Sequence, residues 1–471
     1  MRVAIIGGGI AGLAAAYELE LAHAAGADVA YELFEAGPRL GGVIASEIAD
    51  GTVLELGPDS FLTEKPAAIA LCRELGLESS LIPSNDETRK TYIVVRNRLV
   101  PLPDGLMFLV PTKLVPTALS PLFSFGTKVR MAMELISSPK PHAGGDESVA
   151  ALVRRHYGQE VVDRLADPLL SGIYGGDAEQ LSAQSVLARF ASLEAEYGSL
   201  TRGMLASRRK MIAATGPMQR PTFTTLKDGL QQLIDALVSR LDEEALHRGT
   251  PVSGVDRSGN GWLVHGPGGD PKFDAVIVAT PAWIAAELLR EADVELSEAL
   301  EEIPYTSSIT MNLVYDEAKL GPLPEGFGFL VPAVEQRVLM ACTFVHRKFS
   351  GRTAPGKAVL RAFVGGARNE ALLAAPDEKL AAMVRNELRE ILGIDAAPER
   401  VELRRWPRAM AQYAVGHKQR MERIGTRVAE LPGLHLAGNA YDGIGISDCI
   451  RLGRKAAKEL ARKQPAKAGK D

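Results

Sequence analysis

The sequence predicts a mixed α/β fold, and three segments far apart in the chain indicate its central parallel sheet. Residues 1–6 are an apolar run that leads directly into GGGIAG at residues 7–12 and then into a helical pattern. Residues 273–278 are a second apolar run that ends at a break, as in a buried parallel strand. Residues 434–439 are a third strand pattern, followed by a glycine-rich turn and a helix. Together these segments predict a Rossmann-like lobe assembled from separated parts of the chain.

The first glycine turn has the spacing of a dinucleotide-binding motif. Gly7 permits a tight turn, Gly9 lets backbone N–H groups approach a pyrophosphate, and Gly12 lets the helix pack closely on the strand. The helix N-terminus, which includes Ile10 and Ala11, presents unpaired N–H donors and a partial positive charge to the phosphates. A glycine turn with a purely structural role is the alternative interpretation.

A second strand pattern at residues 28–35 ends on Glu35 and supports this interpretation. An acid at this distance from the glycine turn is placed to bind a ribose hydroxyl, and a solvated strand end is the alternative. The continuation through Arg39 and the glycine pair at 41–42 resembles that of the flavoprotein superfamily of amine oxidases, phytoene desaturases and porphyrinogen oxidases. In that superfamily the arginine offers cationic donors near the phosphates, and the glycines let the chain approach the flavin. The resemblance implies FAD rather than a nicotinamide cofactor.

Length and composition restrict the class of protein. A chain of 471 residues exceeds one simple core, so two or more lobes are expected. The net charge of −4 gives no indication of nucleic-acid binding. The cysteines lie far apart and the histidines show no metal-ligand spacing, so neither disulfides nor a metal site are expected. No apolar stretch is long enough to span a membrane, and the first strand begins at once, so we expect a cytoplasmic protein.

The elements between the first two strands and residue 200 follow in order. Residues 43–48 and 52–55 predict a hairpin, residues 66–75 a helix that starts at proline, and residues 91–100 a second hairpin. Residues 106–200 are mostly helical in pattern. Their start, residues 106–125, is apolar but interrupted by three prolines. It predicts either packed short helices or a peripheral membrane contact.

The second half of the chain alternates between the expected lobes. Residues 201–222 are polar and basic and predict a loop, and a helix follows from about residue 230. Residues 250–252 predict a strand near the adenine. Residues 306–365 predict several strands, and residues 377–392 predict a helix.

The last predicted strand leads into a second glycine-rich turn at residues 440–446 and a helix that starts near Ser447. Two such turns can bind one cofactor if the first holds the pyrophosphate and the second approaches the flavin. The N-terminus of the last helix would then stabilise negative charge on the reduced ring. An ordinary glycine loop is the alternative.

Five motifs together resemble the HemY-type porphyrinogen oxidases over essentially the whole chain. They lie at residues 7–12, 39–42, 56–62, 171–177 and 437–450. The resemblance implies six-electron oxidation of a porphyrinogen to a porphyrin in haem biosynthesis, with oxygen as the acceptor and hydrogen peroxide as a product. The substrate is either protoporphyrinogen IX or coproporphyrinogen III.

The resemblance also implies a division into three lobes. The expected segments are 1–86, 222–284 and 410–471 for FAD binding, 87–105 and 285–409 for substrate binding, and 106–221 for a helical subdomain at the substrate entrance. A peripheral membrane contact and a homodimer are further expectations.

The matched motifs imply two sets of binding residues, and no catalytic residue is assigned. The expected FAD-binding residues are Gly7, Gly9, Ile10, Ala11, Gly12, Glu35, Ala36, Arg39, Leu40, Gly41, Gly42, Gly57, Pro58, Val252, Ala279, Thr280, Gly438, Gly445 and Ile446. The expected substrate-binding residues are Asp59, Ser60, Arg98, Gly175, Phe329 and Leu330. Arg98 would pair with a propionate, and a solvated hairpin is its alternative. Phe329 would face the macrocycle, and a core position is its alternative.

Other functions stay open at the level of the sequence. An amine oxidase or a carotenoid desaturase would share the FAD motifs, and GDP-dissociation inhibitors carry lipidated proteins on a related fold without flavin. The intact glycine turn, Glu35 and Arg39 argue against such a carrier. A tetra-anionic substrate would need additional cations, and the basic residues of the predicted loop at 201–222 could supply them if that loop folds over the site.

Overall fold

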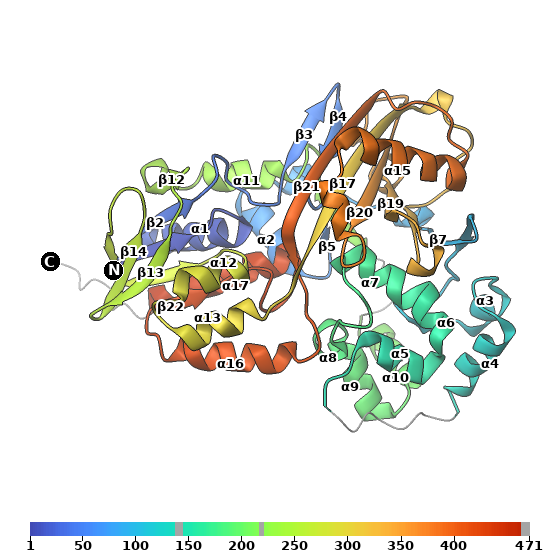
Figure 1. Ribbon diagram of the computed structural model, residues 1–471, viewed down its shortest axis with the longest axis horizontal. Helices are drawn as coiled ribbons and strands as arrows, with labels where there is room; N and C mark the ends of the chain where they lie inside the picture. Colours follow the sequence, from blue (N-terminus) through green and yellow to red (C-terminus); the bar gives the residue numbers. More distant parts are fainter. Residues whose placement is uncertain (137–144, 216–220, 463–471) are drawn as a thin grey trace.

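The computed structural model describes residues 1–136, 145–215 and 221–462, with 211–215 described as backbone only (Figure 1). Three lobes are visible in Figure 1: a nucleotide-binding lobe at the left that holds β1 (Arg2–Ile6) and α17 (Ile446–Arg462), a sheet lobe at the upper right and a helical lobe at the lower right. The mixed α/β prediction is confirmed.

A five-stranded parallel sheet forms the centre of the nucleotide-binding lobe, in the order β12-β2-β1-β16-β22. Its strands are β1 (Arg2–Ile6), β2 (Ala30–Glu35), β12 (Leu246–Arg248), β16 (Ala275–Val278) and β22 (Leu434–Leu436). Because all strands run in the same direction, their carboxyl ends meet at one edge of the sheet. The predicted assembly from distant segments is therefore confirmed.

Two apolar clusters cover the two faces of this sheet. One face packs against α1 (Ile10–Ala24), α2 (Pro66–Glu74), α11 (Gln231–Val238) and α17 (Ile446–Arg462). The other face packs against β13 (Gly254–Ser258), β14 (Gly261–His265), β15 (Lys272–Phe273), α12 (Ala282–Leu289), α13 (Val294–Glu301) and α16 (His417–Ala429). Since α12 and α13 share this second cluster, residues from 282 to 303 pack with the nucleotide-binding lobe.

A seven-stranded mixed sheet forms the sheet lobe, in the order β21-β17-β20-β19-β18-β7-β8. Its strands are β7 (Thr91–Val95), β8 (Arg98–Pro101), β17 (Tyr305–Asp316), β18 (Gly328–Leu330), β19 (Leu339–Phe344), β20 (Lys357–Gly365) and β21 (Arg400–Ala411). The hairpin β7–β8 joins by a parallel pairing of β7 with β18, which brings residues 91–101 into the same sheet as residues 305–411. Helix α15 (Asp377–Leu392) covers one face, and the short α14 (Val345–Lys348) follows β19.

Two small sheets connect the lobes. They contain β3 (Ser46–Ala49) with β4 (Thr52–Glu55), and β5 (Phe61–Leu62) with β11 (Phe223–Leu226) and β6 (Leu81–Pro83). Short 3-10 turns occupy connecting segments: η1 (Glu78–Ser80), η2 (Asp86–Thr88), η4 (Glu243–Ala245), η5 (Glu317–Lys319), η6 (Ala333–Glu335) and η7 (Glu370–Ala374). The predicted hairpins, the proline-started helix, the strands within 306–365 and the helix at 377–392 are all confirmed.

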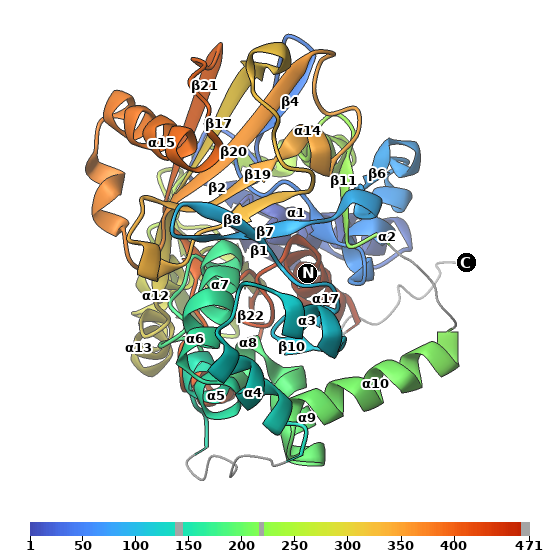
Figure 2. The ribbon, with the colours of Figure 1, turned by 90° about the vertical axis from the view of Figure 1, so that its right-hand side faces the viewer.

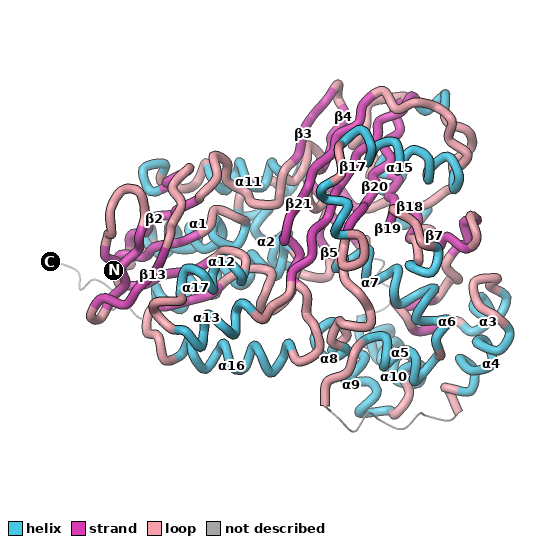
Figure 3. Tube along the Cα trace, viewed as in Figure 1, coloured by secondary structure: helices cyan, strands magenta, loops and turns pink. Residues whose placement is uncertain are grey.

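The helices of the helical lobe lie together in Figures 2 and 3. The lobe has an apolar cluster of its own. It contains β9 (Leu106–Met107), β10 (Val110–Pro111), α3 (Leu114–Leu119), α4 (Phe125–Met133), α5 (Val149–Tyr157), α6 (Gln159–Val161), the π-helix η3 (Val162–Ala166), α7 (Asp167–Tyr174), α8 (Ala183–Val186), α9 (Ala188–Tyr197) and α10 (Leu200–Thr215). No helix in the described ranges is both long and apolar enough to cross a bilayer.

Two local predictions are wrong. The expected loop at 201–222 contains helix α10, because Leu200 and Met204 are buried and the Glu134 carboxylate accepts the N–H of Leu200 at the start of the helix. The expected strand at 250–252 is absent: β12 lies just before it, and the chain turns away after Arg248. Pro251 has no N–H to contribute to a sheet ladder, which is consistent with this end.

Candidate cofactor and substrate site

The first glycine turn forms an open cradle at the carboxyl edge of the parallel sheet. Gly7 has a φ of +107°, and a Cβ there would lie 2.8 Å from the carbonyl oxygen of Ala279. A Cβ on Gly12 would overlap the Gly7 carbonyl. Gly9, which caps helix α1, has no atom within 4 Å of an added Cβ. The turn therefore needs Gly7 and Gly12 for its own packing, and it leaves the space above Gly9 clear for a ligand.

Glu35 ties the end of β2 to this turn. Its two carboxylate oxygens accept the backbone N–H groups of Gly8 and Gly37, each at 2.8 Å. The carboxylate thus lies beside the glycine turn, where the ribose of a dinucleotide would follow the pyrophosphate. Its ribose contact stays a prediction, as does that of the neighbouring Ala36.

The segment 39–42 closes over the same turn. The Arg39 guanidinium donates to the carbonyl oxygens of Leu40 (3.0 Å), Gly42 and Ile44 (2.8 Å), so it holds the loop in shape. Gly41 pairs with Gly9 in an isolated parallel bridge, and a Cβ on Gly42 would lie 3.2 Å from the Gly9 Cα. The phosphate contact of Arg39 stays a prediction; the observed function of this side chain is to shape the loop.

The carboxyl ends of the other strands complete this edge of the sheet. Ala279 and Thr280 follow β16, and Gly438 follows β22 with a φ of +141°. A Cβ on Gly438 would lie 3.7 Å from the Thr280 carbonyl oxygen. Thr250, two residues before the predicted contact Val252, donates its N–H to the Glu35 carbonyl at 2.9 Å. Five segments from the whole length of the chain therefore converge here.

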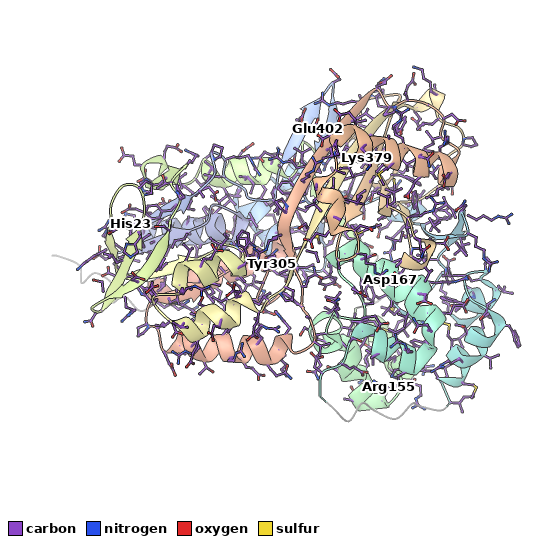
Figure 4. The ribbon with its side chains drawn as sticks, viewed as in Figure 1. His23, Arg155, Asp167, Tyr305, Lys379 and Glu402 are labelled. Atoms are coloured by element: carbon purple, nitrogen blue, oxygen red, sulfur yellow. The ribbon has the colours of Figure 1, made fainter. Side chains whose placement is uncertain are left out.

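The side chain of Tyr413 holds the second glycine turn in place. The Tyr413 hydroxyl donates to the Asn439 carbonyl at 3.0 Å and accepts the Gly443 N–H at 2.8 Å. The Tyr305 hydroxyl, near the junction of the lobes in Figure 4, accepts the N–H of Ala282 at 2.8 Å. Tyr413, in the segment after β21, thus fixes the turn, and Tyr305 of β17 fixes the start of α12.

The start of helix α17 already carries an acid of the protein. Asp448, in the first turn of α17, accepts the N–H of Gly445 at 3.2 Å and pairs with Lys65 at 2.6 Å. Ile446, the first residue of the helix, is buried. The predicted stabilisation of a reduced ring by this helix N-terminus stays a prediction.

The segment Glu55-Leu56-Gly57-Pro58-Asp59 runs between the nucleotide-binding and sheet lobes, and side chains from other parts of the chain hold its carbonyl groups. Gly57 is required here, because its Cβ would overlap the carbonyl oxygen of Val43. The donors to the carbonyls of residues 55, 56, 57 and 59 are Asn312, Thr310, Trp406, Arg361 and Thr225. We call this segment the cavity wall, after its predicted position beside the flavin.

Asp59 is the charged group of the cavity wall. Its carboxylate lies 2.9 Å from the Lys348 ammonium and 3.6 Å from Arg361, and it accepts the Ser60 hydroxyl at 2.6 Å. Burial acts to raise the pKa of Asp59, but Lys348 and then Arg361 outweigh burial and hold this pKa well below its ordinary value. Asp59 is therefore an anion at neutral pH.

The other predicted substrate contacts lie in different environments. Gly175 caps helix α7 with a φ of +58°, and its Cβ would lie 3.3 Å from the Thr306 hydroxyl; the same helix begins at Asp167, labelled in Figure 4. Leu330 packs with the helical lobe. Phe329 is 1% exposed and points into the core beneath α15, which favours its alternative as a core residue.

Arg98 lies exposed on the edge strand β8 and has no hydrogen-bond or ion-pair partner among the described residues. Two basic residues of α10 contact the end of α9: Arg202 donates to the carbonyl of Tyr197 at 2.9 Å, and Lys210 contacts the Tyr197 hydroxyl at 3.2 Å. Within the described ranges, no group of His, Cys, Asp and Glu side chains could hold a metal ion.

Sequence reasoning missed Lys348, Arg352 and Arg361, the cations near the cavity wall. Arg361 had a recognisable signal, because it is the only charged residue in the apolar strand run at 358–364. Lys348 and Arg352 have no such signal, since they belong to a polar connection and become buried only when the lobes meet.

The geometry defines a dinucleotide-binding protein in which segments from both halves of the chain meet at one edge of a parallel sheet. The family described as flavin-containing amine oxidoreductases matches residues 10–461, and the chain belongs to this family. The predicted flavin cofactor is therefore confirmed, and the open cradle above Gly9 fits the pyrophosphate of FAD. The family also identifies the chain as an oxidoreductase.

The chain is also similar to individual proteins whose names give a more specific activity. The chain is 35% identical to a coproporphyrinogen III oxidase of Bacillus subtilis strain 168, over 97% of both chains. It is 30% identical to a coproporphyrinogen III oxidase of Staphylococcus aureus, over 97% of this chain and 98% of the relative. A solved structure from Exiguobacterium sp. 255-15, assigned as a protoporphyrinogen oxidase, superposes with a TM-score of 0.86 at 33% identity and covers 98% of this chain and 99% of its own. The predicted resemblance to porphyrinogen oxidases is confirmed.

Proposed function

We propose that this chain oxidises a porphyrinogen to a porphyrin by six electrons with FAD as its cofactor, and that coproporphyrinogen III is its substrate. The relatives at 30–35% identity over nearly the full chain carry this name. Protoporphyrinogen IX is the second candidate, because a structure at 33% identity is assigned to that activity. The observation that carries the proposal is the convergence of both glycine turns and the cavity wall at one edge of the parallel sheet.

The residues of the chain have distinct tasks in this reaction. Bound FAD would accept a hydride from carbon three times per porphyrinogen, with molecular oxygen restoring it and hydrogen peroxide leaving. The cradle around Gly9 would hold the pyrophosphate, and Glu35 would orient the ribose. The cavity wall would fix the distance between flavin and macrocycle, since hydride transfer depends mainly on positioning.

The test is a comparison of the two porphyrinogens with purified, FAD-loaded protein. Porphyrin fluorescence and oxygen uptake are followed together in steady state. We expect both substrates to be oxidised, coproporphyrinogen III with the higher kcat/KM, and one oxygen to be consumed for each two electrons removed. Absence of turnover with either compound by a fully yellow protein contradicts the proposal.

We also propose that the helical lobe touches an anionic lipid surface. Helices α3 and α4 and their connections expose Leu119 (79%), Phe125 (83%) and Ile136 (84%), and the same segment carries the exposed residues Lys113 and Arg130. A monotopic contact combines such apolar side chains with basic residues. The cytoplasmic location and the homodimer remain predictions.

Co-sedimentation with phosphatidylglycerol vesicles tests this contact. The substitution F125E should lower the bound fraction about tenfold, because it places a carboxylate in the apolar patch. V294E is the matched control, since Val294 is 58% exposed on α13 in another lobe. Equal binding of F125E and wild type, or a loss with V294E of the same size, contradicts the lipid contact.

A further inference from the structure

A cluster of five charged side chains lies between the cavity wall and the sheet lobe. Glu55 and Asp59 belong to the wall, and Lys348, Arg352 and Arg361 come from α14, the following connection and β20. Their side chains are between 1% and 17% exposed. Three cations face two anions, so the cluster has one positive charge in excess. We call these five residues the ion cluster.

Lys348 is enclosed by the groups that it binds. Its ammonium donates to both oxygens of Asp59 at 3.1 and 2.9 Å and lies 3.4 Å from the Ser60 hydroxyl. The rings of Phe223 and Phe349 lie 4.7 and 5.0 Å from the same nitrogen. An ammonium group has three N–H donors, and these contacts account for all of them. All N–H donors of Lys348 are thus used in its contacts with Asp59 and Ser60.

Arg361 acts on the wall from the sheet. Its guanidinium donates to the Gly57 carbonyl, faces Asp59 at 3.6 Å and lies 4.9 Å from the Phe363 ring. The side chain is 2% exposed, so protein atoms cover it on every side. Arg361 therefore influences a ligand only through Gly57 and Asp59.

The other pair of the cluster fixes the beginning of the wall. Arg352 pairs with Glu55 at 2.5 Å and donates to the Thr225 hydroxyl and the Leu226 carbonyl, both at 2.9 Å. Because this pair neutralises itself, the excess positive charge belongs to the group of Lys348, Arg361 and Asp59.

We propose that Lys348 and Arg361 are positioning residues that fix the cavity wall, and that Asp59 is a permanent anion of the site and not the acceptor of the substrate proton. The inference rests on the proposed function in one respect only, that the wall faces the cofactor and the substrate. It adds residues to the reaction that the sequence motifs did not contain, and it assigns the proton released from the pyrrole to another acceptor.

The electrostatics give the proposal a pH signature. The groups that face the Asp59 carboxylate are Lys348 from α14, Arg361 from β20 and the neighbouring Ser60. Since its pKa in the folded protein is depressed, the stability from Asp59 is fully present above about pH 4 and is lost as pH falls further. Ionisation of Asp59 therefore leaves the rate unchanged between about pH 5 and 9. Without Lys348, only Arg361 and Ser60 oppose the effect of burial, so the pKa of Asp59 should rise.

The experiment compares K348M, D59N and the double variant K348M/D59N with wild type. The readouts are the flavin absorbance spectrum, the flavin midpoint potential from dye titration, and the pH profile of kcat. We expect K348M to shift the flavin spectrum, to gain an acid limb in kcat and to lose on the order of tenfold in rate at pH 6. The double variant should lose that limb, because the side chain at residue 59 can no longer take up a proton.

Two further variants keep the test decisive. K348R retains the charge and should keep the pH profile of wild type, even where K348M yields little folded protein. K357M is the matched control, because Lys357 lies on β20 in an ion pair with Glu399 at 2.6 Å on the surface, and its loss should change none of the readouts. A K348M protein with the spectrum, potential and flat profile of wild type overturns the proposal.

The result for D59N separates the two possible tasks of the carboxylate. A positioning anion predicts that D59N keeps measurable turnover and changes the flavin spectrum. Complete loss of turnover with an unchanged spectrum and potential would identify Asp59 as the proton acceptor and overturn the inference. Failure of the proposed function is distinguishable, because the spectrum and the potential require no porphyrinogen.

Discussion

The glycine cradle and the cavity wall are both predicted to contact FAD, but backbone atoms shape the cradle and side chains shape the wall. The cradle is shaped mainly by backbone: a Cβ added to Gly7 or Gly12 would come nearest to a main-chain carbonyl, and a Cβ added to Gly9 would meet no atom within 4 Å. The wall is shaped by side chains that reach it from residues more than 150 positions away, such as Arg361 and Thr225. A site can thus combine one half encoded in a contiguous motif with another half encoded only in tertiary contacts.

Substitution of Gly9 should give the largest effect and should affect binding alone. G9V is expected to abolish FAD retention, because the added side chain occupies the space where the pyrophosphate meets the helix N-terminus. The fold should persist, since no protein atom lies within 4 Å of the new Cβ. Flavin absorbance per protein and thermal unfolding of the apoprotein measure the two effects.

G12A serves as the contrast within the same turn. Its Cβ would overlap the Gly7 carbonyl, so the variant should lose stability as well as flavin. A yellow and active G9V protein would refute the assignment of the cradle, and equal unfolding temperatures of G12A and wild type would refute its backbone packing.

Substitution of Gly57 addresses the wall. G57A should destabilise the protein on the order of 3 kcal/mol, because its Cβ would overlap the Val43 carbonyl, and neither backbone segment can move without breaking the hydrogen bonds of the wall. Denaturant unfolding measures the loss. G425A is the control, since its Cβ meets nothing within 4 Å in helix α16. If G57A and G425A have the same free energy of unfolding, the cavity wall tolerates a side chain at residue 57 and is less rigid than its contacts indicate.

The cradle could be predicted from the sequence because its physics is local. The spacing of Gly7, Gly9 and Gly12, the acid at the end of β2 and the second glycine turn follow from strand and helix patterns within a few residues. Predictions failed where tertiary packing decides the outcome: α10 forms because it buries Leu200 and Met204 and receives a cap from distant Glu134.

The side chains that hold the cavity wall could not be predicted from the sequence, for the same reason. A lysine such as Lys348 appears in a sequence as an ordinary surface residue, and only the meeting of two lobes buries it against Asp59. Phe329 is a related case, because the alternation of side chains in a strand decides which face it takes, and that register is set by β7 and β19.

Enlarging Gly175 tests whether the helical lobe shares in the site. G175A should raise KM about tenfold and keep FAD bound, because the nearest side chains to its new Cβ would be Thr306 and Met410 of the sheet lobe and not the glycine cradle. A cost in stability of about 1 kcal/mol is expected as well, since its φ of +58° disfavours a side chain. Steady-state kinetics separate KM from kcat. Unchanged KM would place this turn outside the cavity.

Of these substitutions, removal of the Arg98 side chain should have the smallest effect on KM. A parallel variant of Lys90 compares a cation without a partner with a cation in an ion pair. Arg98 has no partner among the described residues, whereas Lys90 on the same hairpin pairs with Glu325 at 3.0 Å. If Arg98 binds a propionate, R98A should raise KM about fivefold, or about 1 kcal/mol, because an exposed ion pair is weak. The effect should fall with added salt.

The variant K90A is the control and should leave KM unchanged, because the charge of Lys90 is already neutralised within the protein. Equal KM values for R98A, K90A and wild type would show that the hairpin is only a solvated edge, and the propionates would then need cations from another part of the chain.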